Sequence, residues 1–225
     1  MSGNGPIDSG HHHCGHTYRF PERAPNRQIS DEELWELSYY RASELAGSLL
    51  MGRLARRARD DELRARLTWH FAEEARHAWR WTEVIRTLGA DPVAVDETYQ
   101  SNYLARVGIP SDEVELLALT YVFERRVAQH FALHRSLPDL HPLIRDTLAS
   151  MCGEEGPHLR WIRERLDAEA TRLGRVGRDR VEGTIRRYEA IDREVYRAEA
   201  RKFVARGWKL PERMLEELGE AGSRR

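Results

Sequence analysis

Apolar residues recur at helical spacing through most of the chain, and polar or helix-breaking residues interrupt them at a few points. Ser30, with Glu33 three residues later, is a capping-box motif that opens a helix predicted over residues 30 to 59. Asp60 is placed to cap a second helix, which Gly89 ends. Because so few residues separate these helices, they are predicted to form an antiparallel hairpin.

Three more helices are predicted in the second half of the chain. Pro110 begins a third helix that ends before residue 137, and Pro142 lies near the first turn of a fourth that reaches residue 173. A fifth is predicted over residues 179 to 206. The chain is therefore predicted to be all-α, with the third and fourth helices forming a second antiparallel hairpin.

The link between the two hairpins, residues 89 to 110, is long enough to run the length of a bundle. Fully extended it reaches on the order of 70 Å at about 3.3 Å per residue, whereas a helix of about 28 residues is only about 42 Å long. We therefore expect a four-helix bundle with one long crossover connection and an additional C-terminal fifth helix. The expected division is a flexible arm over residues 1–28, the bundle over 29–173, and the fifth helix with a charged tail over 174–225.

Composition narrows the class of protein without identifying it. The 225 residues are 40% hydrophobic, which suits one sizeable core, and the charged residues, 32% of the chain, nearly cancel to a net charge of −1. This balance gives no support to a nucleic-acid partner. Cys14 and Cys152 lack the paired spacing of a rubredoxin-type or structural zinc site. Because no apolar run approaches the roughly 20 residues of a membrane span, we expect a cytoplasmic protein that does not bind membranes.

The residues that carry chemistry occur in a pattern that is repeated. Glu74 with His77, and Glu155 with His158, have Glu-x-x-His spacing on the second and fourth predicted helices. Residues three apart lie on one face of a helix, so each pair can present a carboxylate and an imidazole to a single point. An internal duplication of a helical hairpin explains the repeat.

Glu44 and Glu124 complete the set, because each lies on the other helix of its hairpin at a matching position. The helical faces around all four glutamates are mostly apolar. Four carboxylates on such faces would be very costly to bury unpaired, and two divalent metal ions would offset their charge. In a metal-free alternative the same residues are satisfied core polar groups or lie on solvated faces, and the protein is a helical interaction module.

The order Glu, Glu-x-x-His, Glu, Glu-x-x-His over residues 30 to 170 resembles the ferritin-like superfamily, in particular its rubrerythrin-like and bacterial di-iron oxidase and oxygenase branches. The resemblance implies two iron ions bridged by Glu74 and Glu155. The remaining ligands it implies are Glu44 and His77 for one ion and Glu124 and His158 for the other. Manganese, or a mixed manganese and iron pair, would suit the same ligands.

Three further features bear on this comparison. Pro157 lies inside the second Glu-x-x-His, where a proline removes a backbone donor, so a kink or π-bulge is expected there. Tyr121 lies one turn before Glu124 on the same face and is a candidate to hydrogen-bond a ligand or pass an electron, although a plain core tyrosine is the commoner case. The run HHHCGH near the N-terminus is a candidate for adventitious metal binding.

These inferences favour an oxidoreductase that activates O2 or peroxide at the metal pair and oxidises a small organic substrate, with electrons from an external donor. A ferroxidase or iron-handling protein, with or without a surrounding protein shell, would use the same ligands. A tRNA-modifying hydroxylase would also use this kind of site, although the charge balance gives that function no special support. The fifth helix would cover the site, shape a substrate channel or form an oligomer interface, as in a homodimer, and the sequence leaves these alternatives open.

Overall fold

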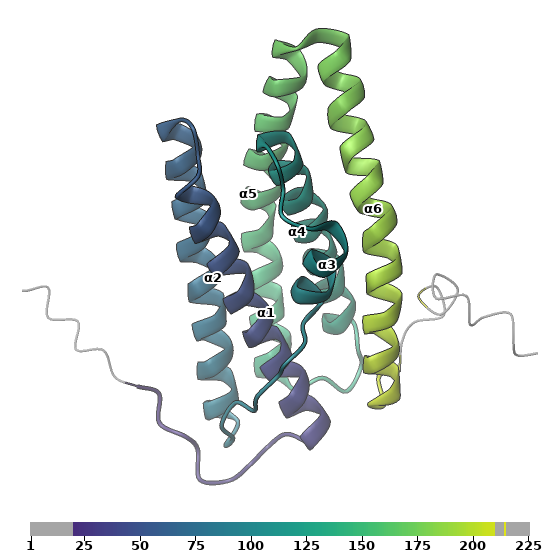
Figure 1. Ribbon diagram of the computed structural model, residues 1–225. Helices are drawn as coiled ribbons and strands as arrows, with labels where there is room; N and C mark the ends of the chain where they lie inside the picture. Colours follow the sequence, from purple (N-terminus) through teal and green to yellow (C-terminus); the bar gives the residue numbers. More distant parts are fainter. Residues whose placement is uncertain (1–19, 210–213, 215–225) are drawn as a thin grey trace, which may run out of the picture.

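The computed structural model describes residues 20–209 and Met214, and this part of the chain contains six helices and no strand. The helices are α1 (Asp31–Ala55), α2 (Asp61–Thr87), α3 (Tyr99–Val107), α4 (Glu113–Arg135), α5 (Pro142–Arg172) and α6 (Gly174–Ala205). The predicted all-α class is therefore confirmed. In Figure 1, α1 and α2 form one hairpin and α4 and α5 form another, and α2 also contacts α5.

The starts of the first two helices follow the polar signals in the sequence. The Ser30 hydroxyl accepts a hydrogen bond from the Glu33 amide at 3.1 Å, and the Ser30 amide donates to the Glu33 carboxylate at 2.9 Å. At α2, the Asp60 carboxylate accepts from the Leu63 amide at 2.8 Å. These bonds satisfy amides that have no partner within the first turn of a helix. Both predicted caps are confirmed.

Two helices differ from the prediction. The link between α2 and α4 contains the short helix α3, which is capped by Thr98; in Figure 1 the link leaves the lower end of α2 and reaches the upper end of α4. Helix α6 begins at Gly174, directly after Leu173, and not near residue 179. Gly174 has a φ of +65°, which glycine adopts readily, so the chain reverses here without a longer loop.

Helix α5 continues through Pro157 as an unbroken α-helix, so the expected π-bulge is absent. The proline deprives the helix of one backbone hydrogen bond. Helix α5 packs against α4 and α6. Because the helix is unbroken, Glu155 and His158 keep the relation of residues three apart on an ordinary helix.

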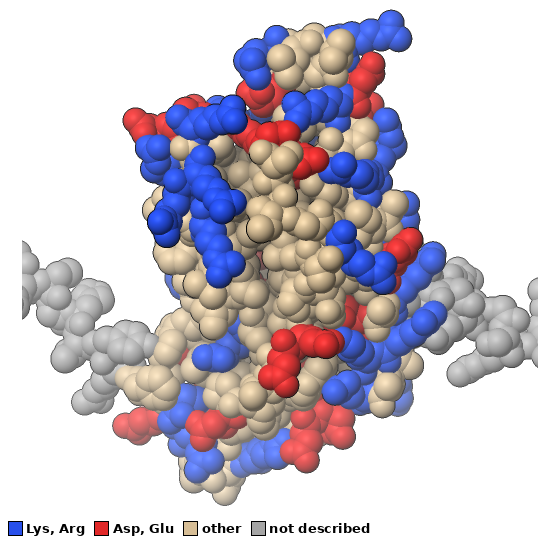
Figure 2. Space-filling view, in the orientation of Figure 1, with Lys and Arg blue, Asp and Glu red and all other residues tan. Residues whose placement is uncertain are grey.

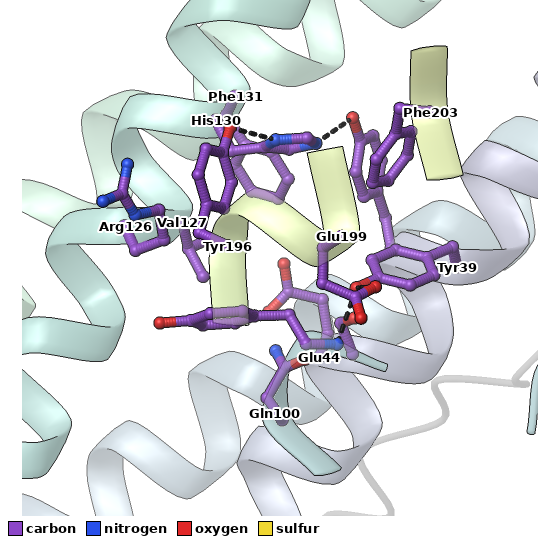
Figure 3. Close-up of a pocket in the computed structure, with 13 residues that line it drawn as sticks. Tyr39, Glu44, Gln100, Arg126, Val127, His130, Phe131, Tyr196, Glu199 and Phe203 are labelled. Atoms are coloured by element: carbon purple, nitrogen blue, oxygen red, sulfur yellow. Dashed lines mark hydrogen bonds between the residues drawn. The ribbon is translucent and has the colours of Figure 1, made fainter. Parts of the chain in front are cut away.

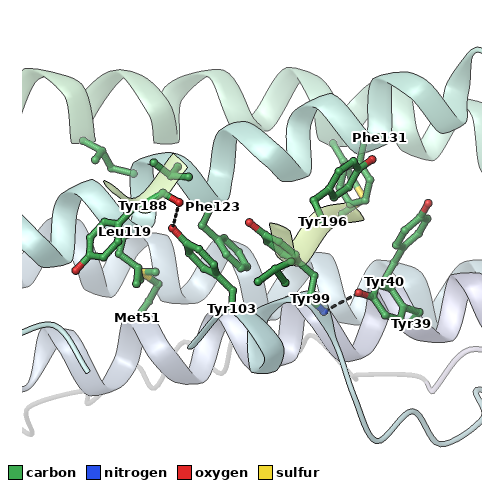
Figure 4. Packing of buried hydrophobic residues seen from close by; sticks show 14 of the residues in the cluster. Tyr39, Tyr40, Met51, Tyr99, Tyr103, Leu119, Phe123, Phe131, Tyr188 and Tyr196 are labelled. Carbon is green, nitrogen blue, oxygen red and sulfur yellow. Dashed lines mark hydrogen bonds between the residues drawn. The ribbon is translucent and has the colours of Figure 1, made fainter. Parts of the chain in front are cut away.

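Helices α3 and α6 are additions to the four helices of the two hairpins, α1, α2, α4 and α5. Helix α3 packs on α1 and α6, and α6 also packs on α4 and α5. Two tyrosines of α3 enter the core that these helices share (Figure 4). The Tyr99 ring stacks on Tyr103 at 5.6 Å and on Phe123 at 5.5 Å between ring centroids. The Tyr103 hydroxyl donates to the backbone carbonyl of Tyr188 at 3.2 Å. The aromatic side chains thus join α3 and α4 to α6.

Residues 20–28 lie against the C-terminal end of α2. The Ala24 amide donates to the Arg86 carbonyl, and the Gln28 amide donates to the Leu88 carbonyl, each at 2.9 Å. The contact is close enough to require glycine at position 89. Gly89 has a φ of +82°, and a Cβ atom added there would lie 2.1 Å from the Asn26 carbonyl oxygen.

Charged groups of both signs are distributed over the face of the molecule shown in Figure 2, with uncharged surface between them. This interleaving agrees with the net charge of −1. In the described part of the chain, no helix combines the length and apolar character needed to cross a membrane.

Candidate metal centre

The six residues predicted as metal ligands lie together in the middle of the bundle. One comes from α1, two from α2, one from α4 and two from α5. Each is at most 3% exposed. The residues are Glu44, Glu74, His77, Glu124, Glu155 and His158.

Their donor atoms form two groups that could each hold a metal ion. Glu44, Glu74 and His77 form the first group, and His70, Glu74, Glu124 and His158 form the second. Within each group the donor atoms lie within 4.8 Å of one another, and Glu74 belongs to both.

Glu155 lies between the two groups. Its Oε1 atom is 3.6 Å from His77 Nδ1, and its Oε2 atom is 3.2 Å from His158 Nδ1. With Glu155 the two groups make up seven residues, called the carboxylate–histidine cluster below.

His70 is the member of this cluster that sequence reasoning missed. Its Nε2 atom lies 3.3 Å from Glu74 Oε1 and 3.2 Å from Glu124 Oε1. His70 stands four residues before Glu74, so the helical period places both on one face of α2. The next residue, the apolar Phe71, is 37% exposed, whereas His70 is fully buried.

Several donor atoms of the cluster are buried without a hydrogen-bond partner. They include Glu74 Oε1, Glu124 Oε2, Glu155 Oε1, His77 Nδ1 and His158 Nε2. Buried polar atoms are nearly always paired, and carboxylate oxygen with imidazole nitrogen is a donor set that divalent transition metals accept. The residues therefore fit a pair of metal ions.

The buried carboxylates of the cluster repel one another, so positive charge placed among them would stabilise them. Burial and the Glu74 carboxylate raise the pKa of Glu44 well above its usual range, and burial and the Glu124 carboxylate do the same to Glu155. Burial alone would raise the pKa of Glu74 as well, but its contact with His70 lowers it. Burial disfavours charge on His70, yet the Glu124 and Glu74 carboxylates outweigh burial and raise its pKa. Divalent cations would relieve this repulsion between carboxylates.

Glu154 holds one of the histidines from outside the cluster. Its Oε2 atom lies 3.1 Å from His77 Nε2, which leaves Nδ1 of that ring turned toward the cluster. Arg80 and Ser150 in turn contact Glu154 Oε1 at 2.7 Å and 2.9 Å. Outer contacts of this kind fix the orientation of ligating imidazoles.

Tyr121 is half-buried on α4, and the Arg125 guanidinium lies 5.6 Å from the centre of its ring. Among the contacts of the described residues, none joins Tyr121 to the carboxylate–histidine cluster. Its catalytic role stays a prediction. The HHHCGH run and Cys14 lie outside the described residues.

A cavity lies beside the cluster, between α1, α3, α4 and α6 (Figure 3). It has an empty volume of about 420 Å³. Aromatic side chains make up much of its wall, and Glu44 is the cluster residue that lines it. Two buried atoms of lining residues, Ser43 Oγ and Gln100 Oε1, have no hydrogen-bond partner. The cavity is therefore a place where a small polar molecule can meet the cluster.

Comparison of the chain with protein-family models, with curated proteins and with solved structures finds no match. The function is accordingly argued from the residues themselves. They form a helical protein with buried histidine and glutamate groups that could bind metal.

Proposed function

We propose that the carboxylate–histidine cluster binds two iron ions and that the protein is a ferritin-like di-iron oxidoreductase that oxidises a small organic substrate. The observation that carries the proposal is the pair of donor groups that share Glu74. Two groups with one common carboxylate are the arrangement expected for two neighbouring ions with a bridging ligand.

The residues would divide between the two ions much as the resemblance to the ferritin-like superfamily implies. Glu44 and His77 would hold one ion, and Glu124 and His158 the other, with His70 as an additional ligand of the second. Glu74 and Glu155 would serve both. A mixed oxygen and nitrogen set favours a redox metal such as iron, and manganese suits the same donors.

When bound, an iron pair supplies the redox and Lewis-acid chemistry that O2 or peroxide activation requires. The chain's own residues set the conditions for that chemistry. Burial of the cluster excludes bulk water, Glu154 orients His77, and the cavity at Glu44 admits a small molecule. The electrons would come from an external donor.

The test is the metal content of protein purified without chelator and of metal-free protein reloaded with Fe(II) in the absence of air. We expect about two ions per chain, and optical changes when O2 is then admitted. Thermal unfolding gives a second readout, because a ligand at about 1,000 times its dissociation constant stabilises the folded state by about 4 kcal/mol.

The possible outcomes separate the candidate functions. Two irons and a reaction with O2 would support the oxidoreductase and justify a search among small organic substrates. Many irons per chain would favour an iron-storing protein instead. No binding of iron or manganese, and no change in the unfolding temperature, would overturn the proposal.

A further inference from the structure

A second group of buried polar side chains lies beside the metal centre and is not part of it. The Tyr40 hydroxyl on α1 lies 3.0 Å from Glu36 Oε1, 2.9 Å from His130 Nε2 and 2.9 Å from His134 Nδ1. His130 Nδ1 is 3.0 Å from the Tyr196 hydroxyl on α6. We call these five residues the Tyr40 network. Figure 3 shows the His130 ring with hydrogen bonds on both sides.

The protons in this network can be counted. A tyrosine hydroxyl has one proton to donate and can accept two hydrogen bonds. Since Tyr40 has three neighbours, at least two of them must donate to it. Burial raises the pKa of Glu36 to about 8, so its carboxyl group keeps a proton at neutral pH and can be one donor. One histidine nitrogen is then the second donor, and the other accepts from Tyr40.

This arrangement allows an unbroken chain of donors in one direction. Tyr40 donates to Glu36 when Glu36 is a carboxylate, and this bond reverses when Glu36 is protonated. Glu36 then donates to Tyr40, Tyr40 donates to His130 Nε2, and His130 Nδ1–H donates to Tyr196. Burial lowers the pKa of His130 to about 3, with Arg126 as a smaller cause, so its ring is neutral and has one donor and one acceptor nitrogen. Every link is between 2.9 Å and 3.0 Å.

The inner end of the chain reaches the cavity at the metal centre. Tyr40, His130 and Tyr196 all line the cavity whose wall includes Glu44. With an empty volume of about 420 Å³, the cavity has room for water molecules. The unpartnered Ser43 Oγ and Gln100 Oε1 atoms would bind them.

The outer end lies under Trp208, just beyond α6. The Trp208 side chain hydrogen-bonds Glu36, and its ring stacks on His130 at 5.0 Å between centroids. Trp208 is only half-buried and Glu36 retains 5% exposure, so solvent lies close to this end. The charged groups that act on the network from around it are Glu33 on α1, Arg126 on α4 and Arg145 on α5.

We propose that Glu36, Tyr40, His130 and Tyr196 form a proton path from the surface at Trp208 to the cavity beside Glu44. The inference rests on the proposed function, because the reduction of O2 or peroxide to water consumes protons. In one passage, Glu36 gives its proton to Tyr40, Tyr40 to His130 Nε2, His130 Nδ1 to Tyr196, and Tyr196 to a cavity water. Glu36 regains a proton from solvent, no electron moves, and each residue ends neutral.

The first test uses the metal-free protein and does not depend on the proposed function. Tyr40→Phe removes the central hydroxyl, and Tyr103→Phe is the matched control because Tyr103 is equally buried but donates to a backbone carbonyl outside the path. NMR would measure the exchange of the His130 ring N–H proton with water. Without Tyr40, a His130 proton can still reach the cavity through Tyr196, but it can reach bulk solvent only when the protein opens locally, which we expect to make exchange about tenfold slower or more. Equal exchange rates in Tyr40→Phe and the control would overturn the proposal.

The second test uses Fe(II)-loaded protein and measures O2 consumption in H2O and in D2O. We expect Tyr40→Phe to bind as much metal as the wild type but to react on the order of 10-fold or more slowly, with a larger solvent isotope effect. The Tyr103→Phe control should match the wild type in both the rate of O2 consumption and the solvent isotope effect. A slower reaction with an unchanged isotope effect would assign the network a structural role only. Failure of the wild type to bind metal would count against the proposed function, while the NMR exchange would still decide the path.

Discussion

Glu74 lies between the two groups of donors, and its surroundings explain how it can serve both. Its Oε1 atom is 3.3 Å from His70 Nε2, 3.6 Å from His158 Nδ1 and 3.9 Å from His77 Nδ1. On its other side, a Cβ atom at Gly47 would lie 3.2 Å from Oε2, so the glycine leaves room for this carboxylate against α1. At the scale of single residues, Glu74 therefore belongs to both candidate metal positions.

Replacing Glu74 should thus have a larger effect than replacing a ligand of one group. We expect Glu74→Ala to lose both ions, whereas Glu44→Ala should retain about one per chain. Glu73→Ala is the control, since Glu73 pairs with Arg76 and lies outside both groups. Elemental analysis after reloading with Fe(II) makes the measurement. Two ions retained by Glu74→Ala would show that this carboxylate is not shared.

At the scale of elements, the end of α2 shows how one glycine positions a whole segment. Residues 20–28 follow the last turn of α2, and the Asn26 carbonyl lies where a side chain at position 89 would begin. Gly108 also has a positive φ, of +74°, but nothing lies within 4 Å of its missing Cβ. A side chain at position 108 would therefore meet backbone strain alone, whereas one at position 89 would meet backbone strain and a steric clash.

Three alanine substitutions make this comparison. Gly89→Ala should destabilise the fold by about 2 kcal/mol or more, because it combines an unfavourable φ with a clash. Gly108→Ala should cost about 1 to 2 kcal/mol for the φ alone, and Gly183→Ala, inside α6 with open space around it, should stabilise by about 0.5 to 1 kcal/mol. Urea unfolding gives the three values. Equal effects at positions 89 and 108 would contradict the contact with residues 20–28.

At the scale of the whole molecule, the Tyr40 network joins α1, α4 and α6 and makes stability depend on pH in two opposite ways. Burial raises the pKa of Glu36 from 4.5 to about 8, so the folded state binds a proton that the unfolded state releases. The stability that this proton provides is complete below pH 4.5 and is lost as pH rises toward 8. Burial lowers the pKa of His130 and His134 to about 3, so their contribution is lost as pH falls from 6.5 toward 3.

Glu36→Gln isolates the first effect, because an amide keeps hydrogen-bonding capacity but does not titrate. Between pH 5.5 and 7.5, the stability of the wild type should fall relative to that of the variant by up to about 1.4 kcal/mol per pH unit. Urea unfolding of both metal-free proteins at several pH values measures the difference. Comparing the pair removes the contribution of other groups that titrate in both. A difference that does not change with pH would mean that Glu36 is ionised in the folded protein.

Much of the fold could be predicted from the sequence because its signals are local. The caps at Ser30 and Asp60 act over three residues, and helical periodicity acts over a few turns. The Glu-x-x-His spacing places a carboxylate and an imidazole on one face whatever the helix packs against. The all-α class and the six candidate ligands follow from such short-range relations.

Other features depended on which helical faces meet, and only the tertiary structure decided them. His70 and Phe71 are adjacent on α2, but only the histidine faces inward, where it contacts Glu124 of α4 and His158 of α5. Helix α3 is too short for a strong periodic signal, yet its Tyr99 and Gln100 side chains help to enclose the cavity. The Tyr40 network joins residues from 36 to 196 through single hydrogen bonds. Periodicity along the chain determines the face of a helix on which a side chain lies, whereas the partner of that face is set by the packing of all the helices together.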